Sequence, residues 1–216
     1  MSRLQDIVER IRADFEARNA ARDQALIRSR ELTRHCANAI RATHRGDFAA
    51  AQALLNTAAK EAAVMAADLE DYPDLYYAGY TQDALKEYVE ASVTYAVIHG
   101  EPLPSPEELR VEYPAYLNGL AEASSELRRH TLDLIRHGEA SQGERILEVM
   151  EDIYAELITI DYPDAITGGL RRTTDQLRAV LERTRGDLTL SIRQEAMRQA
   201  LQDFESRMMP GGGPDE

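Results

Sequence analysis

At 216 residues the chain is long enough for one domain with a continuous hydrophobic core, and its 44% of hydrophobic residues excludes a disordered protein. Its net charge of −13 gives no overall attraction for nucleic acid, so a polyanion would have to meet a local arginine cluster, a metal ion or an enclosed surface. No apolar run approaches the roughly 18 residues of a membrane span, and the charged N-terminus lacks the core of a signal peptide. We therefore expect a cytoplasmic protein without membrane contacts. The single cysteine, Cys36, excludes an intramolecular disulfide and a cysteine-based metal cluster.

Helical periodicity governs the first third of the chain. Apolar residues recur every three or four positions from residue 4 to about residue 45, which predicts a long amphipathic helix that must pack along others. A turn follows, in which Gly46 ends this helix and Asp47 caps the next. The second helix, residues 48 to about 69, is rich in alanine and so permits close approach of its neighbours.

The rest of the sequence is also helical. Pro73 interrupts the pattern, and Ser105-Pro106 begins a short helix. The longer helices are expected at about residues 76–99, 115–136, 142–160 and 165–207. No segment alternates like a strand, so we predict an all-α single domain of six to seven helices over residues 1–208, followed by a disordered tail at 209–216.

Two acidic pairs stand out on these helices. Glu87 and Glu90 are three residues apart, which places them on one helix face, and the apolar segment 91–98 that follows them is typical of a buried helix. Glu122 and Glu126 lie four residues apart on a later helix. Four carboxylates on two helices could share a hard divalent cation.

Each pair also has an ordinary explanation. Glu122 and Glu126 continue in a row with Arg129, Asp133 and Arg136, which is typical of a solvated, salt-bridged helix face. The first pair could stand where a helix emerges into solvent at its N-terminal end, where carboxylates favour the helix dipole. From the residues alone, a carboxylate metal site and a merely charged surface both remain open.

Other candidate functional side chains are histidines and tyrosines. His44 and His130 are candidate ligands or bases, and His130 follows Glu126 by the four residues of a helical ligand pair, although lone histidines on helices are more often partly buried packing residues. Six tyrosines are typical of packing residues with a wet hydroxyl group, and stacking on bases is their alternative role. They are Tyr72, Tyr76, Tyr77, Tyr80, Tyr88 and Tyr95.

Two motifs in order resemble the translin family, and most closely its catalytic branch, that of translin-associated factor X. They are E-Y-V-E-A at residues 87–91 and Y-L-x-G-x-x-E-x-x-x-E-L-x-R at residues 116–129. Ser29-Arg30-Glu31 and the segment 188–193 agree with the same family, so the resemblance covers roughly residues 20–193. The family has an aspartate where this chain has Glu122, which keeps the charge and lengthens the side chain.

This resemblance implies about seven helices assembling into a hollow homo-oligomer, commonly an octamer, whose active sites face the interior. Members bind single-stranded RNA and DNA, and the catalytic branch is a metal-dependent endoribonuclease that cuts RNA with Mg²⁺ or Mn²⁺. Carried over by position, Glu87, Glu90 and Glu122 become catalytic residues, and together with Glu126 they become the metal ligands.

The phosphate contacts are expected among the arginines, at Arg30, Arg34 and Arg129, with Arg18 and Arg22 as further candidates. Two alternative functions remain open. One is a non-catalytic shell that binds single-stranded nucleic acid, as in translin itself, and the other is a helical metal-binding protein without a nucleic-acid role.

Overall fold

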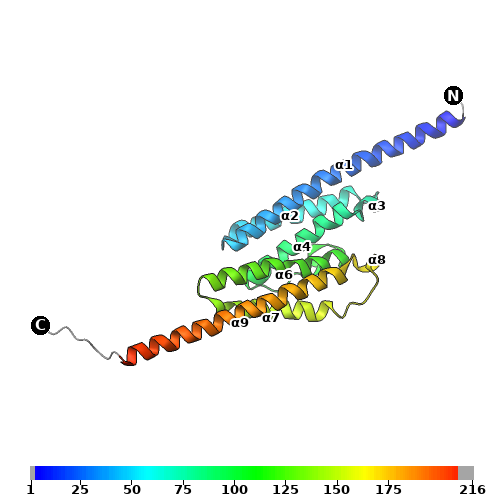
Figure 1. Ribbon diagram of the computed structural model, residues 1–216. Coiled ribbons are helices and arrows are strands. Elements are labelled where there is room, and N and C mark those ends of the chain that lie inside the picture. Colours follow the sequence, from blue (N-terminus) through cyan, green and yellow to red (C-terminus); the bar gives the residue numbers. More distant parts are fainter. Residues whose placement is uncertain (1–2, 209–216) are drawn as a thin grey trace.

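The computed structural model describes residues 3–208, and this part of the chain is an all-α bundle, as predicted (Figure 1). The predicted disordered tail, residues 209–216, lies outside the described residues. Six helices in residues 3–208 have 18 or more residues and three have a single turn of four. They are α1 (Arg3–His44), α2 (Phe48–Asp68), α3 (Pro73–Tyr76), α4 (Gly79–His99), α5 (Pro106–Leu109), α6 (Tyr113–Arg136), α7 (Ala140–Leu157), α8 (Asp164–Thr167) and α9 (Leu170–Met208).

The first turn forms from local signals, as expected. Gly46 adopts a φ of 72°, which favours glycine and ends α1. The Asp47 side chain accepts a hydrogen bond of 3.1 Å from the backbone N–H of Ala50 and so caps α2. The chain therefore doubles back, and α2 packs along α1 through small buried residues such as Ala51 and Ala58.

Two of the differences from the predicted helix boundaries bear on the candidate site. The central helix begins at Gly79, three residues later than expected, because Pro73 starts a separate one-turn helix before it. The last helix is divided into α8 and α9, because Gly168 and Gly169 take φ values of 63° and 85° that no helix can continue. These breaks place the start of α9 beside α6, next to the candidate site.

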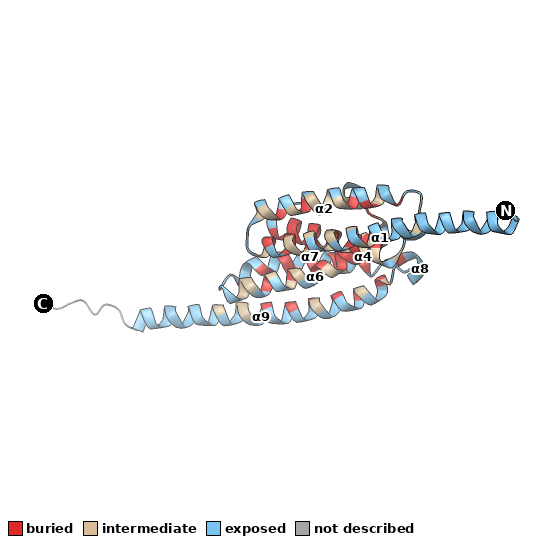
Figure 2. Cartoon of the chain, turned by 90° about the horizontal axis from the view of Figure 1, so that it is seen from above, coloured by how far each residue is buried: buried red, intermediate tan, exposed pale blue. Residues whose placement is uncertain are grey.

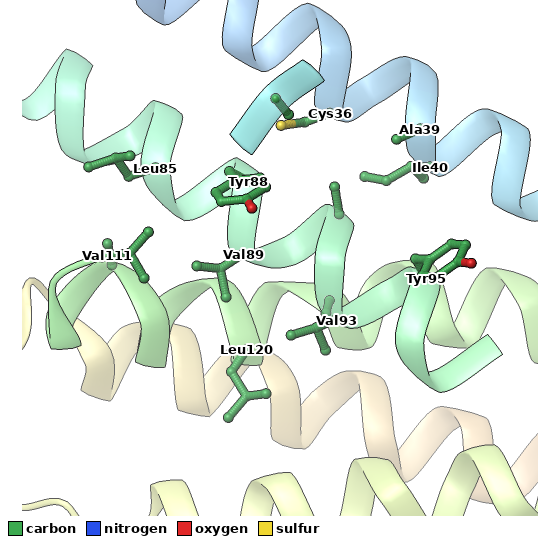
Figure 3. Close-up of a cluster of buried hydrophobic side chains, with 14 of the residues drawn as sticks. Cys36, Ala39, Ile40, Leu85, Tyr88, Val89, Val93, Tyr95, Val111 and Leu120 are labelled. Carbon is green, nitrogen blue, oxygen red and sulfur yellow. The ribbon is translucent and has the colours of Figure 1, made fainter. Parts of the chain in front are cut away.

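Helix α4 is the centre of the bundle. It lies between the α1–α2 pair on one side and α6, α7 and α9 on the other (Figure 1). Residues 91–98 of α4 are buried on every side, as their apolar sequence predicted. Figure 3 shows Tyr88 and Val89 between side chains of α1, such as Cys36, and Leu120 of α6.

The backbones of α4 and α6 nearly touch at Gly119. A Cβ atom built there would lie 2.6 Å from the carbonyl oxygen of Lys86 and 2.7 Å from the Cβ of Val89. Only a residue without a side chain allows this approach. The acidic side chains that flank this contact on each helix, such as Glu87 and Glu122, are consequently held close to one another.

The ends of α1 and α9 project from opposite ends of the bundle and are exposed along most of their length (Figure 2). Both projections carry large apolar side chains in contact with solvent. On α1 these are Leu4, Ile7, Val8, Ile11 and Phe15, and on α9 they are Leu190, Met197, Leu201, Phe204 and Met208. No helix within residues 3–208 combines the length and apolarity that crossing a bilayer requires.

Candidate functional site

The structure brings both acidic pairs together where α4 faces α6. Glu87 and Glu90 on α4 and Glu122 and Glu126 on α6 are all partly buried, and we call these four residues the carboxylate cluster. Burial is the main cause that raises the pKa of Glu90, and with the charges of Glu87, Glu122 and Glu126 it brings this pKa to about 8. Burial also raises the pKa of Glu87, and the charge of Glu122 is the second cause of this shift. The four side chains therefore form one electrostatic unit rather than two independent surface pairs.

Lys86 is part of this site, and sequence reasoning did not assign it a role. Its Nζ lies 3.0 Å from Oε1 of Glu122 and 3.6 Å from Oδ1 of Asp83. The one signal available in the sequence was its rarity, since only Lys60 and Lys86 among the 25 basic residues are lysines. Lys86 places a fixed positive charge at the edge of the carboxylate cluster.

His44, at the end of α1, supplies the partner of Glu126. Its Nε2 lies 2.6 Å from Oε2 of Glu126, and its side chain is almost fully buried. This hydrogen bond lowers the pKa of Glu126, although burial opposes the shift. The predicted partner, His130, instead lies beside His44 with ring centroids 6.3 Å apart, and burial and His44 lower its pKa.

The cluster offers the right donor atoms for a metal ion, but two of its four carboxylates already bond to other side chains. Carboxylate oxygens are the ligands that Mg²⁺ and Mn²⁺ prefer. Within residues 3–208, no group of three or more His, Cys, Asp or Glu side chains is arranged to hold an ion. Glu122 bonds to Lys86 and Glu126 bonds to His44, so both would have to turn away from these partners toward a cation. The donor set fits a hard dication, which would relieve the repulsion that Glu90 experiences.

The raised pKa of Glu90 predicts a pH dependence of stability. In the folded protein Glu90 keeps its proton up to about pH 8, whereas in the unfolded chain it loses the proton near its ordinary value of 4.5. The folded state therefore binds the extra proton between these values, and the stability of the parent protein should fall as the pH rises through that window. Glu90→Gln removes this loss.

The quantity to compare is the melting temperature of Glu90→Gln minus that of the parent protein. We expect this difference to increase by at least about 3 °C from pH 5 to pH 8.5, since about 1 kcal/mol corresponds to 2–4 °C in a domain of this size. Thermal unfolding in EDTA measures this difference. Glu151→Gln is the control, because Glu151 lies on α7, outside the carboxylate cluster, and pairs with Arg185 of α9; this variant should show the pH profile of the parent protein. If the difference in melting temperature between Glu90→Gln and the parent protein were the same at pH 5 and pH 8.5, Glu90 would ionise normally.

The candidate phosphate-binding arginines differ in how free they are. Arg30 and Arg34 are exposed on α1 and have no ion-pair partner in the described part of the chain. The side chain of Arg129 is 58% exposed and lies 3.8 Å from Glu126, at the edge of the carboxylate cluster. Arg18 and Arg22 are already paired, with Asp74 and Asp23 respectively, both at 3.1 Å. The first three are thus the better placed to meet a phosphate.

Similarity to known proteins identifies the family of this chain. No family model matches the sequence. The uncharacterized protein MJ0175 of Methanocaldococcus jannaschii is 31% identical over 185 residues, which are 85% of this chain and 82% of that protein. Among solved structures, AfC3PO in complex with duplex RNA is 34% identical with a TM-score of 0.79 over 85% of this chain and 95% of that chain.

Two further structures agree. The crystal structure of AfC3PO is 35% identical with a TM-score of 0.77, over 85% of this chain and 96% of that chain. Apo-NeC3PO is 21% identical with a TM-score of 0.78 over the same shares, and it supports the fold alone. C3PO proteins are assemblies of the translin type, so these similarities agree with the motifs at residues 87–91 and 116–129. The chain belongs to the translin family.

Proposed function

We propose that this protein is a metal-dependent endoribonuclease that acts on single-stranded RNA. The observation that carries the proposal is the carboxylate cluster, in which burial and the carboxylates of two helices together raise the pKa of Glu90 to about 8. The RNA complex of AfC3PO, a relative that shares 34% of its residues with this chain, supports RNA as the substrate. Glu87, Glu90 and Glu122 act as catalytic residues and, with Glu126, hold Mg²⁺ or Mn²⁺. A bound ion of this kind activates water and neutralises charge on the phosphate.

The residues around the cluster have complementary tasks. Lys86 and His44 hold Glu122 and Glu126 through contacts of 3.0 and 2.6 Å, so both carboxylates have a partner when no cation is present. Arg129 stands beside Glu126 and, being largely exposed, is placed to bind a phosphate next to the cluster. A negatively charged protein thus meets RNA through a few local cations.

Cleavage of labelled single-stranded RNA by the pure protein tests this function. We expect endonucleolytic products with Mn²⁺ and none after addition of EDTA. Products that persist in EDTA would rule out a metal-dependent enzyme. Intact RNA at every Mn²⁺ and Mg²⁺ concentration would rule out a nuclease.

A non-catalytic RNA-binding shell is the second candidate, and one observation favours it. Two of the four carboxylates are satisfied by Lys86 and His44, so the site can exist without a cation. A shell would bind labelled RNA with the same affinity in Mn²⁺ and in EDTA and would leave it intact. A protein that bound Mn²⁺ but no RNA would instead be the helical metal-binding protein.

The arginine assignment predicts how RNA binding depends on salt. Each phosphate contact to a single strand contributes about 0.7 to the slope of log K against log salt concentration. Replacing Arg30, Arg34 and Arg129 together by glutamine should therefore lower the slope by about 2. The control is Arg18→Gln with Arg22→Gln, because these arginines are paired with aspartates and should contribute less. An unchanged slope in a triple variant that still assembles would show that RNA contacts another face.

The projecting helices predict self-association. Helices α1 and α9 carry exposed apolar side chains well beyond the bundle, such as Phe15 at 65% and Phe204 at 60% exposure, and a second copy would remove these from water. We expect a closed homo-oligomer of eight chains, with a mass by light scattering of about eight times the 24.2 kDa of one chain. A mass near 24.2 kDa at working concentration would contradict this expectation.

A further inference from the structure

A cavity of about 760 Å³ adjoins the carboxylate cluster. It lies between the N-terminal parts of α4 and α6 and the turn that joins α8 to α9. Lys86 and Glu122 line it, so the cavity and the cluster share one ion pair. The translin-type site, as proposed above, does not account for this cavity.

Two exposed apolar side chains line the cavity from different elements. Tyr77, which precedes α4, and Ile166, on α8, are each 61% exposed. The ring of Tyr77 meets that of Tyr76 edge to face, with centroids 5.0 Å apart, and this contact orients it. An oriented aromatic ring and an aliphatic side chain at one cavity offer a flat, apolar ligand a place to stack.

Polar side chains of the cavity suit a nucleobase edge. Asn118 is buried and fixed, because its Nδ2 donates to the carbonyl oxygens of Pro114 and Thr167 and its Oδ1 accepts from Thr173. Gln176 and Arg172 line the same space, and their side chains have no hydrogen-bond or ion-pair partner in the described part of the chain. The cavity therefore presents a free amide, which can both donate and accept, and one free guanidinium group.

The charges of the cavity limit what it can bind. Asp83, Glu112 and Glu122 oppose Lys86 and Arg172, so its net charge is slightly negative. A ligand with several phosphates in the cavity would be repelled, whereas a base with a single phosphate near Arg172 would not.

We propose that this cavity is a subsite for one unpaired nucleotide of the RNA strand, with its base against Tyr77 and Ile166, its hydrogen-bonding edge at Gln176 and its phosphate at Arg172. The inference rests on the proposed function for the identity of the strand. The base in this subsite anchors the backbone next to Glu122, so an RNA must expose an unpaired base to be positioned at the carboxylate cluster.

Binding of two oligoribonucleotides in EDTA tests the subsite independently of metal and cleavage. The probes are fluorescein-labelled hexaadenylate and a hexamer of the same charge whose riboses carry no bases. Tyr77→Ala should weaken binding of hexaadenylate about five- to 150-fold, the range for loss of one base–aromatic stack, and should leave the abasic hexamer unaffected. Arg172→Gln should weaken both probes equally, since both carry the phosphate.

Matched controls come from a second cavity of about 740 Å³ on the α7 side of α8, which Tyr162 and Arg171 line. Tyr162→Ala and Arg171→Gln should change binding of either probe by no more than about twofold. Three results would overturn the subsite: parent-like binding of hexaadenylate by Tyr77→Ala, an equal loss of binding of both probes by Tyr77→Ala, or no hexaadenylate binding by the parent protein. If the protein cleaved RNA with Mn²⁺ but Tyr77→Ala did not selectively weaken binding of hexaadenylate, the proposed function would stand and the subsite would not. If Tyr77→Ala did so but the protein cleaved no RNA, the subsite would stand and the proposed function would not.

Discussion

Glu90→Gln should reduce Mn²⁺-dependent RNA cleavage about 100-fold or more while the protein remains folded. Glutamine keeps the volume of the side chain and removes the negative charge that a cation requires. Glu90 is the member of the carboxylate cluster on which the other three carboxylates act together, so its loss weakens the field of the whole cluster. Without metal Glu90 keeps its proton up to about pH 8, so a neutral glutamine of the same volume should not harm folding. Initial cleavage rates on labelled RNA measure the effect, and thermal unfolding checks the fold.

Two further variants make this result specific. Glu151→Gln, in which the lost carboxylate pairs with Arg185 on another face, should cleave at the parent rate. Glu122→Asp keeps the charge and restores the residue typical of the family, so it should retain or increase activity. Parent-like cleavage by Glu90→Gln would show that the cluster is a structural ion-pair network.

Gly119→Ala should be strongly destabilising because it separates the two helices that carry the site. The added methyl group would lie 2.6 Å from the carbonyl oxygen of Lys86, a backbone atom that cannot move without α4. Overpacking a core typically costs about 1–3 kcal/mol, and here a backbone clash places the expected cost at the upper end. The melting temperature should therefore fall by roughly 6–12 °C, and RNA cleavage should decrease with it.

Gly186→Ala on α9 is the matched control. No atom outside its own helix lies within 4 Å of the added methyl group, so the variant gains helix propensity without a clash. It should be more stable than the parent protein by about 0.5–1 kcal/mol. A Gly119→Ala protein as stable as the parent would show that α4 and α6 do not approach at this point.

The parts of the fold that sequence reasoning predicted are those with local causes. The stripe of α1, the turn at Gly46 and Asp47, and the buried segment of α4 each follow from neighbouring residues. The breaks around the short helices were harder. A proline such as Pro73 can begin a helix as well as interrupt one, and the pair Gly168-Gly169 ends a helix while Gly186 alone does not.

The site was predictable as a set of residues but not as a set of contacts. The spacing of each acidic pair indicated a shared face, and the order of the motifs indicated the family. The partners of these acids come from other helices. His44 meets Glu126 across 82 positions of sequence, and Lys86 meets Glu122 only because Gly119 lets α4 and α6 touch. Such pairings depend on how helices pack, which periodicity does not encode.

The most direct test of the central claim is a crystal structure of the protein grown with Mn²⁺, with anomalous scattering recorded to locate the metal. The account predicts an anomalous peak between α4 and α6, ligated by at least three members of the carboxylate cluster, with Glu122 turned from Lys86 or Glu126 turned from His44. Absence of a peak there, with Glu122 still bonded to Lys86 and Glu126 still bonded to His44, would contradict it.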